Sequence, residues 1–93
     1  MGATSREALD ALVRGEAGLV LASLIARLGD FDLAEDALQD AVAEALERWP
    51  RDGVPERPAA WLAGVARNRA LDRLRHRAGR AGRAGRLRRA GGG

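Results

Sequence analysis

Cysteine, lysine and tyrosine are absent from the chain, and histidine occurs once, as His76. Without cysteine there is neither a disulfide framework nor a thiolate metal site. A single histidine in an arginine-rich run has no second imidazole with which to share a metal ion. The sequence therefore disfavours redox and zinc chemistry, and we expect no cofactor.

Long apolar runs are missing as well. The most apolar stretch, residues 19–25, is short, and Glu16 and Arg27 lie close to its two ends. A membrane span needs about 20 apolar residues, and a signal peptide has a basic segment before its apolar core. We therefore expect a soluble, cytoplasmic protein with no membrane partner.

The sequence also lacks the residue patterns on which catalysis depends. No nucleophile stands beside a histidine, no glycine-rich phosphate loop follows a strand pattern, and no carboxylate cluster has a histidine at metal-ligand spacing. These absences favour a binding protein over an enzyme.

Charge is abundant but unevenly divided along the chain. Residues 1–66 carry a net charge of −6, whereas residues 67–93 hold 10 arginines and one acid, a net charge of +9. An acidic segment suits a basic protein surface, and a basic segment suits a polyanion such as nucleic acid. A coding bias would explain the choice of arginine over lysine, but it would not explain this clustering.

The length and the periodicity predict one small all-α domain, a helical bundle of about three main helices over residues 1–78. Residues 79–93 repeat Gly-Arg-Ala and end in glycine. Such low-complexity sequence cannot bury a core, so we expect a disordered basic tail there.

A capping-box pattern opens the first predicted helix. Thr4 is followed three residues later by Glu7, and apolar residues then recur at helical spacing from about Ser5 to Leu28. Two internal glycines, at positions 15 and 18, lower the helix propensity and allow a kink or a close packing contact near the middle.

A second amphipathic helix is predicted to begin at Asp32, which can accept from the first free amides while Glu35 reaches back. Phe31, just before it, suits a hydrophobic staple. Apolar residues follow in steps of three and four up to Trp49, and Pro50 closes the helix. A further face carries like charges, at Asp36, Asp40, Glu44 and Glu47.

Residues 50–57 contain three turn-forming residues and are predicted to be an ordered surface loop. Pro58 suits the first turn of a third helix, which we expect to continue to about Arg77. One side of this helix is apolar and includes Trp61. Arginines occupy most of the remaining surface, at Arg67, Arg69, Arg73, Arg75 and Arg77.

Three motifs, in this order, resemble region 2 of the extracytoplasmic-function (ECF, group 4) sigma factors of bacterial RNA polymerase. The first is the acidic run DLAEDALQD at residues 32–40, and the second is LERWP at residues 46–50. The third is PAAWLAGVARNRALDRLR at residues 58–75. Each motif alone is common among helical proteins, but their order and spacing together are specific.

The resemblance implies a transcription initiation factor domain with two partners. In the family, the second helix packs on the clamp helices of the largest subunit of core RNA polymerase. The following loop and helix hold the non-template strand of the promoter −10 element and help to melt it. An anti-sigma factor is a further candidate partner.

The resemblance and the residue chemistry together imply two sets of binding residues in this chain, one for polymerase and one for DNA. Charge-assisted pairs with basic clamp side chains would steer polymerase binding. The residues expected to make these contacts are Asp36, Gln39, Asp40 and Glu44. The expected DNA-binding residues are Arg67, Asn68, Arg69, Arg73, Arg75 and Arg77.

The two kinds of DNA contact differ in chemistry. Guanidinium groups over several helical turns bind phosphates and position DNA without reading it. Asn68 has an amide that donates and accepts, and by resemblance it faces a base flipped from the stack.

Simpler interpretations stand beside these assignments. The acids of the second helix are equally typical of a solvated face, and Asn68 of a surface residue bonded to its own backbone. Asp72 suits an intrahelical pair with Arg69 or Arg75. Trp49 and Trp61 suit the core better than they suit a platform for stacked bases.

The chain also departs from the family pattern. Ala41 and Val42 stand where members usually have an aromatic residue, which suggests looser packing. Members continue into a helix-turn-helix domain, region 4, that reads the −35 element, and residues 79–93 show no such pattern.

The alternative function is a small helical adaptor with an acidic protein-binding helix and a tail that binds nucleic acid non-specifically.

Overall fold

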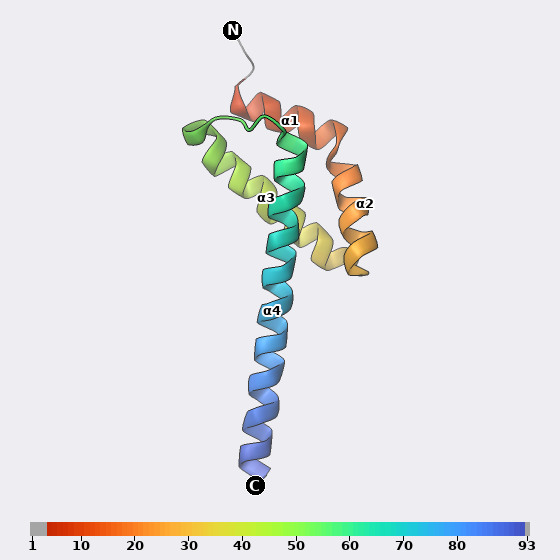
Figure 1. The fold of residues 1–93 in the computed structure, drawn as a ribbon, viewed down its shortest axis with the longest axis vertical. Coiled ribbons are helices and arrows are strands. Elements are labelled where there is room, and N and C mark those ends of the chain that lie inside the picture. Colours follow the sequence, from red (N-terminus) through yellow and green to blue (C-terminus); the bar gives the residue numbers. More distant parts are fainter. Residues whose placement is uncertain (1–3, 93) are drawn as a thin grey trace.

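The computed structural model describes the backbone of residues 4–92 and the side chains of residues 4–79. Within this range the chain forms four α-helices and no strand (Figure 1). The helices are α1 (Ser5–Gly15), α2 (Ala17–Leu28), α3 (Phe31–Asp52) and α4 (Pro58–Gly92). The all-α prediction is confirmed.

The predicted first helix is in fact two helices, α1 and α2. The capping box at its start is confirmed, because the Thr4 hydroxyl accepts from the amide of Glu7 and the Glu7 carboxylate accepts from the amide of Thr4. The chain leaves helical geometry at Glu16, with φ −129° and ψ −13°. The break lies between the two glycines that were expected to allow a kink or a close packing contact. It turns α2 away from α1 so that both pack on α3.

The start of α3 corrects the predicted cap. Asp30, not Asp32, is the N-cap, and its Oδ1 accepts from the amide of Leu33 at 3.0 Å. That hydrogen bond, followed by the nearby Arg77, lowers the pKa of the Asp30 carboxyl. Phe31 is therefore the first helical residue, and it is 54% exposed rather than packed as a staple. Gly29 makes this connection possible because its φ of +68° is accessible mainly to glycine.

Pro50 lies inside α3 and does not end it, which is a second correction. Proline has no amide to donate to the carbonyl four residues earlier, here that of Leu46, a loss that costs about 3 kcal/mol in mid-helix. The helix ends at Asp52, where the amide of Gly53 donates to the carbonyl of Trp49 at 2.9 Å. The loop before α4 is thus residues 53–57, and α4 begins at Pro58 as predicted.

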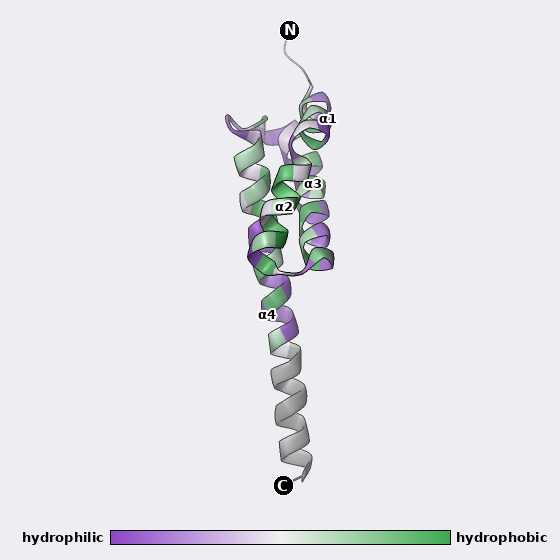
Figure 2. Ribbon diagram, turned by 90° about the vertical axis from the view of Figure 1, so that its right-hand side faces the viewer, coloured by the Kyte–Doolittle hydropathy of each residue, from purple (hydrophilic) through white to green (hydrophobic). Residues whose placement is uncertain are grey.

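A seam of small residues joins α3 to α4. The buried residues of α3 include four alanines, at positions 34, 37, 41 and 45, and those of α4 include Ala66 and Ala70, all with no exposed surface. Alanine lets helix axes approach closely, so the residues flanking the seam also come within reach of one another. Figure 2 shows the hydrophobic residues of the helices gathered on the sides that face one another.

The two tryptophans close one end of this seam. Trp49 is 3% exposed, and Trp61 is half-buried against the same cluster. Their ring centroids lie 5.3 Å apart in an edge-to-face arrangement with an interplanar angle of 63°. The core interpretation is confirmed for Trp49, whereas Trp61 keeps part of its surface accessible.

The backbone of α4 runs on to Gly92, whereas the sequence predicted its end near Arg77. The alanines and arginines of this stretch favour helix, whereas its glycines oppose it. The side chains from Arg80 onward lie outside the described residues, and the tail assigned to residues 79–93 stays a prediction. None of the helices within the described chain is long and apolar enough to cross a membrane.

Candidate functional site

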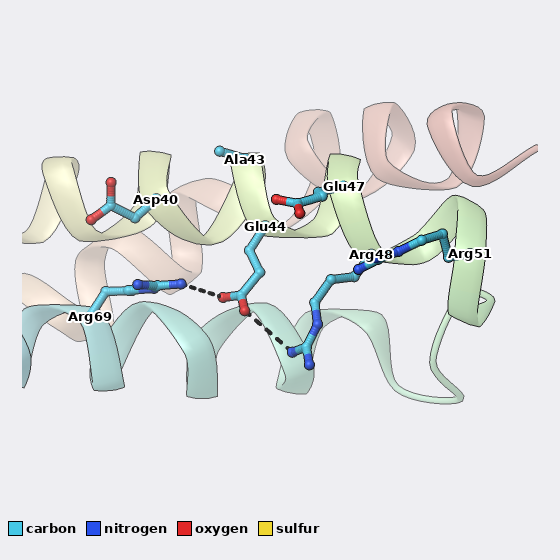
Figure 3. Close-up of a pocket in the computed structure, with 7 residues that line it drawn as sticks. All are labelled: Asp40, Ala43, Glu44, Glu47, Arg48, Arg51 and Arg69. Carbon is cyan, nitrogen blue, oxygen red and sulfur yellow. Dashed lines mark hydrogen bonds and ion pairs between the residues drawn. The ribbon is translucent and has the colours of Figure 1, made fainter.

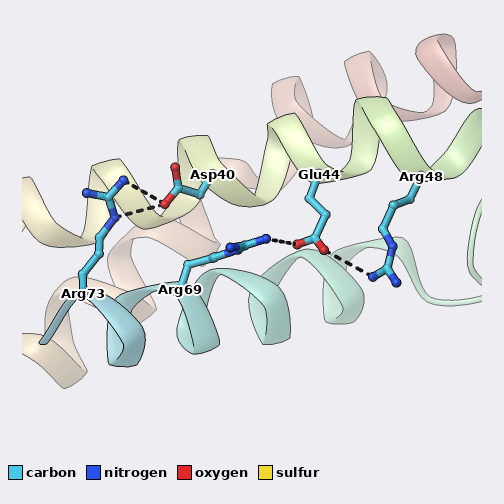
Figure 4. Close-up of polar contacts among 5 residues, drawn as sticks. All are labelled: Asp40, Glu44, Arg48, Arg69 and Arg73. Atoms are coloured by element: carbon cyan, nitrogen blue, oxygen red, sulfur yellow. Dashed lines mark hydrogen bonds and ion pairs between the residues drawn. The ribbon is translucent and has the colours of Figure 1, made fainter. Parts of the chain in front are cut away.

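The acidic edge of α3 faces the arginines of α4. Arg73 donates from both Nε and Nη2 to one carboxylate oxygen of Asp40, at 3.0 and 2.8 Å. Figure 4 shows the guanidinium of Arg73 beside the carboxylate of Asp40. The Nη1 of Arg73 also lies 3.9 Å from a carboxylate oxygen of Asp36. One arginine of α4 therefore pairs with two acids that stand one turn apart on α3.

Glu44 continues the same row one turn further along α3. Its Oε2 accepts from Arg69 of α4 at 3.2 Å, and its Oε1 accepts from Arg48 of α3 at 3.3 Å. We call these six side chains the ion-pair row. Its members are Asp36, Asp40, Glu44, Arg48, Arg69 and Arg73.

The row follows from sequence spacing and from the alanine seam. Acids at positions 36, 40 and 44, and arginines at positions 69 and 73, repeat every four residues and so line one edge of each helix. The row's side chains keep between 20% and 52% of their surface exposed. Exposed pairs of this kind each contribute only about 0.2–1 kcal/mol. A binding partner whose charged groups pair more favourably with these side chains can therefore replace the internal ion pairs at a small cost in free energy.

An open, polar hollow lies along this row. Figure 3 shows Glu47, Arg48 and Arg51 around its α3 side and Arg69 entering from α4. Acids and arginines alternate around it, which gives it no single sign of charge. This arrangement suits a surface that exchanges ion pairs with another macromolecule better than it suits a small-molecule site.

Gln39 is separated from the other three residues expected to bind polymerase. It lines a groove on another side of α3, formed with Val13 and Ala17 and with the apolar side chains of Leu38, Val42 and Leu46. Val13 is 41% exposed and Leu46 is 47% exposed. This groove could not be predicted from the sequence, because it forms only where α1 and α2 meet α3.

The arginines expected to bind DNA do not share one face of α4. Arg69 and Arg73 point to α3, and Arg77 donates to Asp30 at 3.4 Å. Arg75 pairs with Asp72 at 3.3 Å, which confirms the predicted intrahelical pair. Among residues 4–79, the remaining two, Arg67 and Asn68, are exposed and form no side-chain hydrogen bond or ion pair.

The fold and the row of charges define a class of protein, a small all-α domain with charged side chains along its helix surfaces. The model of the Sigma-70 region 2 family matches residues 12–80, so the chain belongs to this family. Members are non-enzymatic domains of transcription initiation factors that in general bind core RNA polymerase and recognise the promoter −10 element. The match covers α2, α3 and the described side chains of α4.

One curated relative is an uncharacterized protein of Rhizobium meliloti (strain 1021). It is 43% identical over 58 residues, which is 62% of this chain and 14% of that protein. The chain thus corresponds to a small part of this relative's length. No solved structure matches the chain.

Proposed function

We propose that this chain acts as region 2 of an ECF-type, group 4 sigma factor. In this proposal α3 binds the clamp helices of core RNA polymerase, and α4 with the loop at residues 53–57 holds the non-template strand of the −10 element. The observation that supports it most is the separation of charge within the family match, with acids along α3 and arginines along α4.

The polymerase contact rests on the exposed acids of the ion-pair row and on the neighbouring groove. Asp36 is the most open of these acids, with 52% of its side chain exposed and its arginine 3.9 Å away. Basic clamp side chains can pair with such a carboxylate without first breaking a strong internal bond. The apolar groove beside Gln39 would add a contact that is not sensitive to salt.

The DNA contact rests on the part of α4 that faces away from α3. Arg67 offers a guanidinium to a phosphate, and the amide of Asn68 offers a donor and an acceptor to a base edge. The partly exposed ring of Trp61 lies beside the loop at residues 53–57, where the two tryptophans border a shallow pocket.

Charge reversal on α3 tests the polymerase contact. We expect Asp36→Arg to weaken binding to core RNA polymerase at least tenfold, because reversing a charge adds repulsion to the loss of attraction. The matched control is Asp10→Arg, which makes the same change of charge on an exposed position of α1. The measurement is a titration of the labelled chain with core enzyme at two salt concentrations.

Asp40 is a poorer probe than the sequence suggested, because it is half-buried and holds Arg73. Gln39→Arg is the better second variant, since Gln39 is exposed and forms no hydrogen bond or ion pair within residues 4–79. If Asp36→Arg and Gln39→Arg both bind core enzyme as tightly as Asp10→Arg, α3 is not the polymerase-binding helix.

A further inference from the structure

A second groove lies between α2 and α4, away from the ion-pair row. It is lined by Val20, Ser23, Leu24, Arg27, Ala60, Ala63, Gly64 and Arg67. Two of these side chains are arginines, one is a hydroxyl and none is an acid. In contrast, the hollow along the ion-pair row mixes both signs of charge.

The two arginines of this groove differ from the other arginines of α4 whose side chains the structure describes. Those at positions 69, 73, 75 and 77 are each held by a carboxylate. Arg27 and Arg67 are exposed and form no ion pair within residues 4–79. The groove is therefore a place where positive charge from two helices meets without an internal partner.

We propose that this α2–α4 groove binds the phosphate backbone of the DNA strand held by α4, with Arg27 and Arg67 as its phosphate ligands. The inference rests on the proposed function and adds to it a DNA-binding residue on α2. Two guanidinium groups and the Ser23 hydroxyl donate hydrogen bonds, and phosphate oxygens only accept them.

The shape of the groove fits a nucleic-acid backbone. Its α4 wall consists of Ala60, Ala63 and Gly64, and a Cβ added at Gly64 would meet no atom within 4 Å. Small residues leave room for phosphates to approach the arginines. The apolar floor formed by Val20 and Leu24 suits contact with sugar carbons. Arg67 also adjoins Asn68 in sequence, so one strand passing along α4 can reach both.

A purely structural role for Arg27 is the competing explanation. It lies in the last turn of α2, where a positive charge stabilises the helix dipole. Arg14 occupies the same kind of position in the last turn of α1, is likewise exposed, and does not line the groove. The pair Arg27→Gln and Arg14→Gln therefore separates the two roles.

The experiment titrates fluorescent single strands that carry a −10-like sequence with the full chain and core RNA polymerase, at several salt concentrations. One phosphate contact on a single strand contributes about 0.7 to the slope of log K against log salt, which is about fivefold in affinity at 0.1 M salt. We expect Arg27→Gln to lose this amount for every strand sequence. Arg14→Gln should match the wild type.

Ala60→Glu gives a second, independent variant. Ala60 is exposed in the first turn of α4, where an acid is favoured by the helix dipole, so the fold should tolerate the change. An acid placed in the groove repels phosphate, and we expect a loss of at least fivefold for all strands. Polymerase binding, measured without DNA, should be unchanged in both groove variants.

The outcomes separate this inference from the function on which it rests. If the wild type itself fails to bind the strands with core enzyme, the proposed function is wrong. If the wild type binds and Arg27→Gln loses no more than Arg14→Gln, the groove assignment alone is overturned. It is also overturned if the groove variants weaken core-enzyme binding and leave DNA binding intact, because the groove would then dock an acidic protein segment.

Discussion

Arg67 and Asn68 are neighbours on α4, but their side chains have different chemistry and so call for different readouts. A guanidinium binds any phosphate, whereas the amide of Asn68 can match the donor and acceptor pattern of one base. Both are exposed and have no side-chain partner within residues 4–79, so removing either should leave the core intact. Variants of these two residues can therefore distinguish a contact that positions the DNA backbone from a contact that recognises a base.

We expect Asn68→Ala to penalise the preferred base at a single promoter position by about 1–3 kcal/mol and to leave the salt slope unchanged. Arg67→Ala should weaken all sequences alike and lower the slope by about 0.7. The measurement compares strands carrying each of the four bases at the test position, with core polymerase present. A uniform loss across all four bases would make Asn68 a scaffold residue.

The N-caps of α1 and α3 show how far a helix start can be predicted from single residues. The Thr4 and Glu7 pair was predictable because both partners lie within one turn, and the structure confirms it. The cap of α3 was assigned to Asp32 instead of Asp30, although both are followed by helix-forming residues. A glycine that follows a helical pattern, as Gly29 does, signals the end of that helix, but it does not decide which of the two following aspartates accepts from the first free amides.

The ion-pair row forms because the acidic edge of α3 packs beside the arginines of α4. Each stripe was visible in the sequence, because acids on α3 and arginines on α4 recur every four residues. Their mutual contact was not, because it depends on how α4 is rotated about the alanine seam. From the sequence alone, the acids were therefore expected to bind one partner and the arginines another, whereas in the structure Asp40 and Arg73 pair with each other.

This contact predicts that neutralising Asp40 raises the affinity of the free chain for DNA. Asp40→Asn keeps the shape of the side chain but frees Arg73 and removes a negative charge, so the salt slope with single-stranded DNA should rise by up to about 0.7. Stability should fall by no more than about 1 kcal/mol, because the pair is partly exposed. The measurements are a salt-dependent titration without polymerase and a thermal melt.

Asp10→Asn is the matched control for this variant. It makes the same change of net charge on α1, where no arginine pairs with the acid among residues 4–79. An equal rise in DNA affinity for the two variants would mean that net charge alone is responsible and that Arg73 gains nothing from its release.

On the scale of the whole molecule, folding redistributes the bipolar charge of the chain. The net charge of −6 over residues 1–66 and +9 over residues 67–93 suggested two separate binding surfaces. In the structure, Asp30 and the row acids neutralise part of the basic half. Positive charge without such a partner remains in the α2–α4 groove, and residues 79–93 hold five further arginines.

Deleting residues 79–93 distinguishes a sigma-type domain from an adaptor with a nucleic-acid-binding tail. The buried core runs from Leu9 to Ala70, so the shortened chain should still fold, which circular dichroism would verify. Losing five arginines should lower the single-strand salt slope by up to about 3.5 and weaken binding to every sequence. Under the proposed function, the preference for −10-like strands in the presence of core enzyme persists, because α4 before Gly79 carries it. If that preference disappears together with the tail, the adaptor function explains the chain better.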